Sequence, residues 1–364
     1  MLFNYLKLSF RLLIRNPFFT LINVLGLSVG FAAVIVLWPY TQSELQTDQF
    51  LKDAGRLGRL SRHVELKSST YGGSINVSDH PSGIARQIAN EFSEIEELTR
   101  ILHQTNFDKA KIGSGADVFF AIPDGGSKRI FREQRTAFAD SNFFQFFSFP
   151  LIVGDAANVL AQPSTVVLSE KTARKYFSDA NPIDKIIYLN DSIPLKVTGV
   201  FKDLPKNTHM VFDIVVAATG IKAFDFPGTE DSVWAYCYIK INEQSNFVEL
   251  QRAINKHQER IYGVCANCPN LTAYVQSLDD VIFGYVGNNV FTTRSKYFLV
   301  TLRTLSFVTL ALAWINYICL SINMLHKRLP EMGTRKVVGA LGGDYVFQFF
   351  IEATVINRPL FYLH

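Results

Sequence analysis

This sequence of 364 residues contains residue types that take part in catalysis, but few of them form a recognised catalytic motif. It contains no H-E-x-x-H or G-x-G-x-x-G motif, and no G-x-x-x-x-G-K-[ST] loop for nucleotide phosphates. Gly125-Gly126-Ser127-Lys128 lacks the spacing of a phosphate loop and predicts a polar surface turn. We therefore expect a protein that is not an enzyme and binds no metal or cofactor. The histidines lack metal-ligand spacing: His63, His80, His103, His209, His257, His326 and His364.

Cys265 and Cys268 form the one local cysteine pair in the sequence. In an oxidising compartment they are able to form a short-loop disulfide, and the alternatives are two plain cysteines or, less favoured, redox or metal chemistry. A single C-x-x-C without a second pair argues against zinc. Of the other two cysteines, Cys237 is predicted in a buried strand and Cys319 in a membrane span.

Two long stretches of the sequence carry no charge. The first runs for 28 residues from Asn16 to Ser43 and the second for 22 residues from Thr304 to Leu325. Roughly 20 apolar residues cross a bilayer core, so these stretches predict transmembrane helices at 18–40 and 303–325. The alternative of buried core helices is disfavoured by their length without charge. The first stretch is also longer than the apolar region of a signal peptide and predicts a retained anchor.

Basic residues flank both predicted spans on one side of the membrane. Residues 1–40 contain Lys7, Arg11 and Arg15 and no acid, and four basic residues follow the second span. By the positive-inside rule both flanks are cytoplasmic, so residues 41–302 lie outside the cytoplasm. Of the formal net charge of +4, residues 1–40 and 303–364 carry +3 each, which leaves −2 for this part. A near-neutral domain without a basic stripe argues against nucleic acid as a partner.

The N-terminal segment and the first span contain features expected at membranes. Lys7, Arg11 and Arg15 recur every four residues, which predicts an amphipathic cytoplasmic helix over 1–17 whose basic face lies on lipid headgroups. Pro17 favours a new helix at the span. Gly26 and Gly30 form a G-x-x-x-G pair, a spacing that lets another helix approach closely.

Residues 41–302 read as one large α+β domain built from two subdomains. Ser169 is a plausible N-cap for a helix that ends at Phe177. Asn190-Asp191 is a hairpin signal between two strand patterns. The predicted helices are 79–92, 169–177 and 247–262, and the predicted strands are within 95–112 and at 164–168, 185–189, 194–201, 211–217 and 233–241.

The segment 326–344 after the second span predicts a short amphipathic helix across the inner membrane face. Pro330 favours a helix start there, and Gly339 favours its end. Glu331, Arg335 and Lys336 are available for ion pairs. An ordinary basic inner loop is the alternative. A rigid element joined to a spanning helix is suited to pass force from a soluble partner into the membrane.

Glu331-Met-Gly-Thr-Arg-Lys-Val-Val-Gly-Ala340 resembles the E-I-G-x-R-K-x-x-G-A signature of FtsX-like ABC transporter permeases. The opening of the first span, Arg15 to Gly30, is similar to that of the same family, and Ile315-Asn-Tyr-Ile-Cys-Leu-Ser321 resembles its second span. Four further stretches resemble the family's MacB-type periplasmic domain: Asp48-Gln-Phe50, Phe144 to Gly154, Val166 to Phe177, and Val197 to His209.

The resemblance implies a permease subunit in a bacterial inner membrane, paired with a cytoplasmic ABC ATPase that binds ATP and with a second permease copy. ATP-driven motion would reach the periplasmic domain and export or extract a substrate whose identity the sequence does not reveal. The alternatives are a transmembrane regulator, of signalling or of cell-wall hydrolases, and a nonfunctional remnant. ATPase coupling is implied for Glu331, Met332, Gly333, Arg335, Lys336, Gly339 and Ala340.

The last twenty residues depart from the family pattern. Residues 345–357 resemble the start of a third span, but Arg358-Pro359 would place a charge and a helix breaker inside it. We therefore expect an incomplete third span over 345–364, as in a truncated or frameshifted product of a longer eight-span permease.

Overall fold

The computed structural model describes residues 17–66, 73–103, 118–124, 126–221, 233–262, 271–284 and 293–337. The chain divides into two compact units. One is a helical unit from residues up to Leu45 and from Lys296 onward, and the other is an α+β domain of residues 46–295. The predicted segments 1–16, 338–344 and 345–364 lie outside the described residues.

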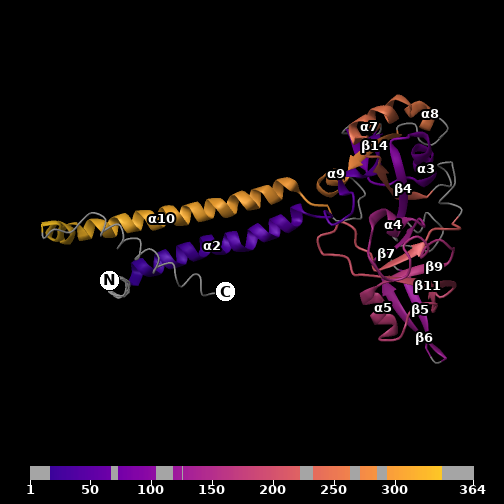
Figure 1. Cartoon of the computed structure of the whole chain (residues 1–364), viewed down its shortest axis with the longest axis horizontal. Coiled ribbons are helices and arrows are strands. Elements are labelled where there is room, and N and C mark those ends of the chain that lie inside the picture. The colour runs from indigo at the N-terminus through magenta and orange to yellow at the C-terminus, as the bar shows by residue number, and fades with distance from the viewer. Residues whose placement is uncertain are drawn as a thin grey trace. The chain divides into compact units, whose positions relative to one another are not determined.

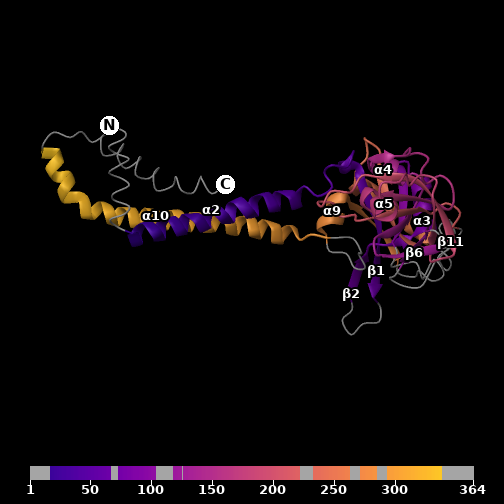
Figure 2. The same ribbon diagram turned by 90° about the horizontal axis from the view of Figure 1, so that it is seen from below.

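Two long helices, α2 (Pro17–Leu45) and α10 (Lys296–Val337), form the helical unit. They run side by side (Figures 1 and 2). Both contain windows apolar enough to cross a membrane, at Leu21–Leu45 and Lys296–Cys319, and only 17% of each window is buried. Apolar side chains therefore cover the outside of this unit, as expected for helices that face lipid.

Both helices are longer than the predicted spans of 18–40 and 303–325. A run of residues without charge indicates only the part of a helix that lies in the hydrocarbon core. The helix itself extends as far as its backbone hydrogen bonds continue. For the same reason the α+β domain occupies 46–295, a shorter range than the predicted 41–302.

The predicted separate helix at 326–344 is wrong in one respect, because α10 continues without a break through Pro330 to Val337. A proline inside a helix removes one backbone hydrogen bond and is expected to bend the helix. The last part of α10 does turn away from the axis of the rest (Figure 2).

The described residues of the α+β domain form one 14-stranded mixed sheet. In it, β11 pairs in parallel with β9, and β12 pairs in parallel with β7. The strand order is β14-β1-β13-β4-β7-β12-β9-β11-β10-β5-β6, with β2, β3 and β8 beside β1, β13 and β11. The strands are β1 (Leu57–Leu66), β2 (Gly73–Val77), β3 (His80–Pro81), β4 (Ile95–His103), β5 (Val118–Asp124), β6 (Ser127–Glu133), β7 (Thr136–Ala139), β8 (Leu151–Val153), β9 (Thr165–Ser169), β10 (Ile186–Leu189), β11 (Ile193–Phe201), β12 (Ile214–Ala217), β13 (Trp234–Ile241) and β14 (Leu271–Ser277).

Short helices cover this sheet. Helices α3, α7 and α8 lie at one end of the domain, and α5 lies near β5 and β6 at the other (Figure 1). Because one sheet runs through both ends, the two predicted subdomains share it. The helices are η1 (Ala54–Arg56), α3 (Ser82–Glu91), α4 (Phe143–Phe147), α5 (Glu170–Phe177), α7 (Phe247–Lys256), α8 (Gln258–Tyr262) and α9 (Leu278–Phe283).

The central strands are buried on both faces, so the domain has two apolar cores. Along β13, Cys237 and Ile239 enter the core shared with α3 and α7. Their neighbours Tyr236 and Tyr238 enter the core filled by the phenylalanines of α4. Alternation along a strand sends successive side chains to opposite faces, which explains why a tyrosine and a cysteine next to each other join different cores.

Several local predictions are confirmed. The Ser169 side chain caps α5 by accepting a hydrogen bond from the backbone N–H of Thr172. Asn190 and Asp191 have positive φ angles of 48° and 60° between β10 and β11, as a tight hairpin requires. The turn at Gly126 joins β5 to β6.

Two helix boundaries differ from the prediction. The helix expected from Asp79 begins at Ser82, because His80 and Pro81 are extended and pair with β13. The helix expected over 247–262 divides at His257 into α7 and α8. The turn brings Tyr262 of α8 to His80, where the two side chains form a hydrogen bond.

Candidate functional site

The segment with the coupling signature is part of α10. Glu331, Met332, Gly333, Arg335 and Lys336 all lie on its helical backbone. The distance from the start of α10 to this stretch is roughly 50 Å at 1.5 Å per residue. The last two residues of the predicted set, 339 and 340, lie outside the described residues.

Gly26 and Gly30 of α2 face α10. A Cβ atom added at Gly30 would lie 3.0 Å from the Ala313 Cβ and 3.3 Å from the Leu310 Cα. At Gly26 the nearest atom would be the Asn316 Nδ2, at 3.4 Å. The absence of a side chain at Gly30 thus allows the two backbones to approach closely, as in small-residue contacts between membrane helices.

Asn23 and Asn316 lie in the apolar part of the helical unit, where the structure describes their side chains. Asn23 is 1% exposed, and its amide has no hydrogen-bond partner among the described side chains. Asn316, which lies beside Gly26, is exposed on α10. Polar residues inside membrane spans are costly and often mark helix contacts or pathways.

A buried chain of polar side chains in the α+β domain begins at Asp48, three residues after the end of α2. Its carboxylate accepts hydrogen bonds from the Thr208 hydroxyl and from both the backbone N–H and the ring Nδ1 of His209. The His209 Nε2 lies 2.8 Å from the Tyr238 hydroxyl. Asp48, His209 and Tyr238 are each 0% exposed.

The environment of this chain keeps Asp48 ionised. Burial alone would raise the pKa of Asp48, but the nearby charge and hydrogen bonds of His209, with the hydroxyl of Thr208, outweigh it and lower the pKa below 3.8. Burial raises the pKa of Tyr238, which therefore keeps its proton. Since solvent reaches none of the three groups, no substrate is able to reach them, and the geometry suits anchoring rather than catalysis.

Buried arginines add two further polar contacts to the domain. Arg100 is 1% exposed and holds Asp140 through two side-chain hydrogen bonds of 2.8 Å. Arg59 is 0% exposed and donates to the Gln276 side chain, whose oxygen also accepts from Ser61. A buried guanidinium is tolerated only when its donors are satisfied in this way.

Two histidines are buried in neutral form. Burial lowers the pKa of His80 to about 4 and that of His103 also to about 4. The His80 Nδ1 donates to the carbonyl of Pro81, and its Nε2 accepts from the Tyr262 hydroxyl. The tautomer is therefore fixed by its two partners.

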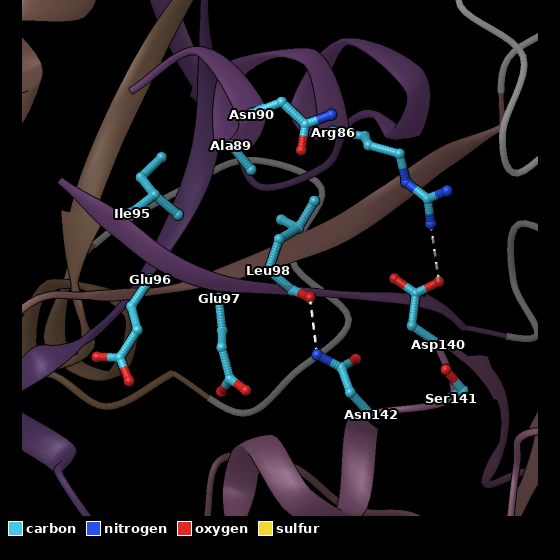
Figure 3. A pocket seen from close by; sticks show the side chains of 10 residues that line it. All are labelled: Arg86, Ala89, Asn90, Ile95, Glu96, Glu97, Leu98, Asp140, Ser141 and Asn142. Carbon is cyan, nitrogen blue, oxygen red and sulfur yellow. Dashed lines mark hydrogen bonds and ion pairs between the residues drawn. The ribbon is translucent and has the colours of Figure 1, made fainter. Parts of the chain in front are cut away.

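An open hollow of about 570 Å³ lies between α3, β4 and the chain after β7. Arg86 reaches across it toward Asp140, and the Asn142 side chain donates to the carbonyl of Leu98 (Figure 3). Asp140 is already held by Arg100. The carboxylate that Arg86 faces is thus engaged in an ion pair, and we assign the hollow no chemistry.

The remaining predicted sites are the cysteines and the candidate metal ligands. Cys237 is a free buried cysteine and Cys319 a free exposed one. Cys265 and Cys268 lie outside the described residues. Within the part of the chain that the structure describes, no group of three or more His, Cys, Asp or Glu side chains is arranged to hold a metal ion.

Comparison with known families decides the relationship of this chain. Residues 20–257 match the model of the MacB-like periplasmic core domain. The chain belongs to this family. The match to the MacB-like family includes Asp48, His209 and Tyr238, together with most of α2, and α10 follows it in the sequence. With its two apolar helices, this MacB-like chain is a membrane protein with an α+β periplasmic-type domain.

Relatives of this MacB-like chain include export proteins. The macrolide export ATP-binding/permease protein MacB of Vibrio parahaemolyticus is 22% identical over 370 residues, covering 96% of this chain and 49% of the relative. The pyoverdine export ATP-binding/permease protein PvdT of Pseudomonas syringae is 20% identical over 379 residues, covering 98% and 50%. The chain thus spans about half the length of these curated relatives. The solved periplasmic region of MacB from Actinobacillus actinomycetemcomitans is 14% identical, with a TM-score of 0.41, and covers 64% of this chain and 95% of that one.

Sequence reasoning missed the polar chain in this MacB-like domain. Asp48 and His209 both lie in stretches that resemble the family, but nothing in one sequence indicates that residues 161 apart form a hydrogen bond. The only available signal was an acid close to the end of a membrane span and a histidine in a polar turn.

Proposed function

We propose that this chain is a permease subunit of an ABC transporter, which passes ATP-driven motion from a cytoplasmic ATPase to the periplasmic-type domain for export or extraction of a substrate. The observation that carries the proposal is the continuity of α10 from Lys296 to Val337. At 42 residues it is roughly 63 Å long, about twice the thickness of a bilayer core. One helix is therefore long enough to join the domain to the coupling segment across the membrane.

The proposed orientation places residues 46–295 in the periplasm and the end of α10 in the cytoplasm. It is supported by the basic residues Lys327, Arg328, Arg335 and Lys336 near that end, which the positive-inside rule assigns to the cytoplasm. The family to which the domain belongs is named for its periplasmic location. This arrangement corresponds to a multi-pass protein of a bacterial inner membrane.

The proposed partners are a cytoplasmic ABC ATPase and a second permease copy. The names of the relatives join an ATP-binding part with a permease part, and this chain matches about half of their length. Its own sequence has no G-x-x-x-x-G-K-[ST] loop, so the partner would bind and hydrolyse ATP. In this proposal the chain has no active site and no cofactor of its own.

Purification from native membranes tests the proposal. The tagged full chain, extracted in mild detergent, is expected to retain an ABC ATPase that mass spectrometry identifies. In nanodiscs, ATP hydrolysis by that ATPase should rise when the chain is present. Replacement of Glu331 or Arg335 by Ala should lower this stimulation about tenfold, because one charged contact is worth roughly 1.5–3 kcal/mol.

Lys327→Ala is the matched control, since it removes a charge from the same helix outside the coupling signature. Stimulation that is unchanged in the Glu331 and Arg335 variants would overturn the coupling assignment. Recovery of the chain without any ATPase would overturn the transporter proposal. Accumulation of a substrate in a deletion strain would distinguish export from a regulatory role.

A further inference from the structure

Arg303 of α10 stacks on Trp38 of α2 near the ends of the helices that join the α+β domain. The guanidinium carbon lies 3.6 Å from the centre of the indole ring. Phe307, one turn further along α10, meets the same ring edge-on at 5.5 Å. Among the described residues no acidic side chain forms an ion pair with Arg303, so its charge is balanced by the ring face and by whatever surrounds the helices.

Three contacts establish the antiparallel alignment of the two helices. Trp38 is level with Arg303, Gly30 with Leu310 and Ala313, and Gly26 with Asn316. The residue numbers of opposite positions therefore add to a nearly constant value. Continued along both helices, this alignment places position 17 opposite position 325.

The alignment determines which part of the pair is free of charge on both helices. The run from Asn16 to Ser43 overlaps the run from Thr304 to Leu325 over positions 17–38 of α2. This shared stretch is roughly 33 Å long at 1.5 Å per residue, close to a bilayer core of about 30 Å. Arg303 and Trp38 lie at its edge, which is where the hydrocarbon ends.

The side chains at this edge suit a lipid headgroup layer. Tyr40 and Phe298 are 48% and 56% exposed, and Tyr297 is 89% exposed. Tyrosines such as Tyr40 and Tyr297 collect at membrane interfaces, and an arginine there keeps its charge in the headgroup region. With its flat face on Trp38, the Arg303 guanidinium keeps N–H donors at its edges, in the fork geometry that matches phosphate oxygens.

We propose that Arg303, held on Trp38, binds the phosphate group of a phospholipid in the leaflet nearest the α+β domain, and that this contact determines the depth of the helix pair in the membrane. The lipid is recognised by its phosphate at the level where the shared charge-free stretch ends. The inference does not depend on the proposed transport function, since it requires only that the helix pair spans a bilayer.

Tryptophan quenching measures the depth. The chain has three tryptophans, Trp38, Trp234 and Trp314. One version of the full chain keeps only Trp38 and another keeps Trp38 and Trp314, with phenylalanine at the remaining positions, so that the difference between them reports Trp314. Both are reconstituted with lipids brominated at shallow or deep acyl positions. Trp38 should be quenched best by shallow bromines. Trp314, roughly 16 Å further along α10, should be quenched best by deep ones.

Retention of lipid measures the phosphate contact. Native mass spectrometry of the detergent-purified chain should detect a bound phospholipid whose retention falls about tenfold in Arg303→Gln, since a charge-assisted hydrogen bond is lost. Arg303→Lys should keep part of it. Lys296→Gln, about two turns away, is the matched control and should retain lipid as the unsubstituted chain does. Excess inorganic phosphate should not displace the lipid.

The Arg303→Lys variant and the helical circular dichroism of each protein separate loss of folding from loss of binding. Equal retention of phospholipid by folded Arg303→Gln and by the unsubstituted chain would overturn the proposed contact. Strongest quenching of Trp38 by deep bromines would overturn the proposed depth. Displacement by inorganic phosphate would show a general anion site in place of a lipid site.

Discussion

The Asp48 carboxylate accepts a hydrogen bond from the His209 ring, although the two residues are 161 positions apart and neither side chain is exposed. Tyr238, in the central strand β13, continues the chain of polar contacts. The first residues of the α+β domain are thereby tied to the middle of its sheet. This connection is internal to the domain and leads to a first prediction about its stability.

Asp48→Asn should destabilise the domain by about 3–5 kcal/mol, since it removes one member of a buried pair and leaves His209 without its charged partner. Chemical unfolding of the full chain in detergent, followed by the fluorescence of Trp234, gives the free energy of unfolding. Asp191→Asn is the matched control. Asp191 pairs with Lys128 at the surface, with 60% and 47% of the side chains exposed, so its loss should cost less than about 1 kcal/mol.

Acid should destabilise the domain between about pH 6.5 and pH 4. His80 and His103 have folded pKa values of about 4, below the ordinary value of 6.5, so the unfolded chain takes up these protons first. Their contribution is constant above pH 6.5, decreases as the pH falls toward 4, and is worth at most about 3 kcal/mol for each histidine.

The same unfolding measurement at pH 7, 5.5 and 4.5 tests this dependence. His80→Gln keeps a donor for the Pro81 carbonyl and an acceptor for the Tyr262 hydroxyl but does not titrate, so its stability should depend less steeply on pH. Equal slopes for His80→Gln and the unsubstituted domain would contradict the buried neutral histidine. Below pH 4 the low pKa of Asp48 adds a further loss, since its carboxylate must then be protonated.

Substitutions of the two glycines should loosen the helix pair in a graded order. Gly30→Leu should be the most disruptive, at about 1–3 kcal/mol or more, because a side chain there would meet Ala313 and the backbone of Leu310. Gly30→Ala should cost less, and Gly26→Ala least, since the nearest atom is a side-chain amide at 3.4 Å. Thermal unfolding of the helices in detergent provides the order, and an equal effect of all three variants would contradict the observed packing.

Arg100 and Asp140 should show strong coupling in a double-mutant cycle. Arg100→Met removes a buried guanidinium with two hydrogen bonds of 2.8 Å to Asp140 and should cost about 3–5 kcal/mol. Addition of Asp140→Leu should cost much less than it does alone. The control pair is Arg174 and Glu170 on α5, where the arginine is 74% exposed and the coupling should stay below about 1 kcal/mol. Additive costs at Arg100 and Asp140 would exclude the coupling.

The sequence predicts those parts of the structure that depend on neighbouring residues. The Ser169 cap, the Asn190–Asp191 hairpin and the two apolar helices each depend on a short pattern, and the structure contains them all. The ends of the long helices were harder to predict from the sequence. Charged residues such as Lys296 mark where the hydrocarbon core ends, but they do not interrupt the helical hydrogen bonds.

Features that depend on distant segments escaped prediction. The parallel pairing of β9 with β11 and of β7 with β12 brings together strands that are separated along the chain, and one sequence contains no record of such pairing. Arg59 and Arg100 are of a type expected at the surface, yet both are buried because partners distant in the sequence satisfy them. The polar chain from Asp48 to Tyr238 escaped prediction for the same reason, because its members are far apart in the sequence.

Because of their alignment, α2 and α10 differ in how strongly each resists movement along the membrane normal. Beyond the level of Arg303, α2 continues without charge from Pro39 to Ser43, a length of roughly 7 Å. Inward sliding of α2 over that distance brings only uncharged residues into hydrocarbon, whereas the same movement of α10 drives a guanidinium into it. At the proposed depth, Arg303 would therefore act as a mechanical stop that opposes an inward stroke of the packed pair at the level of the headgroups.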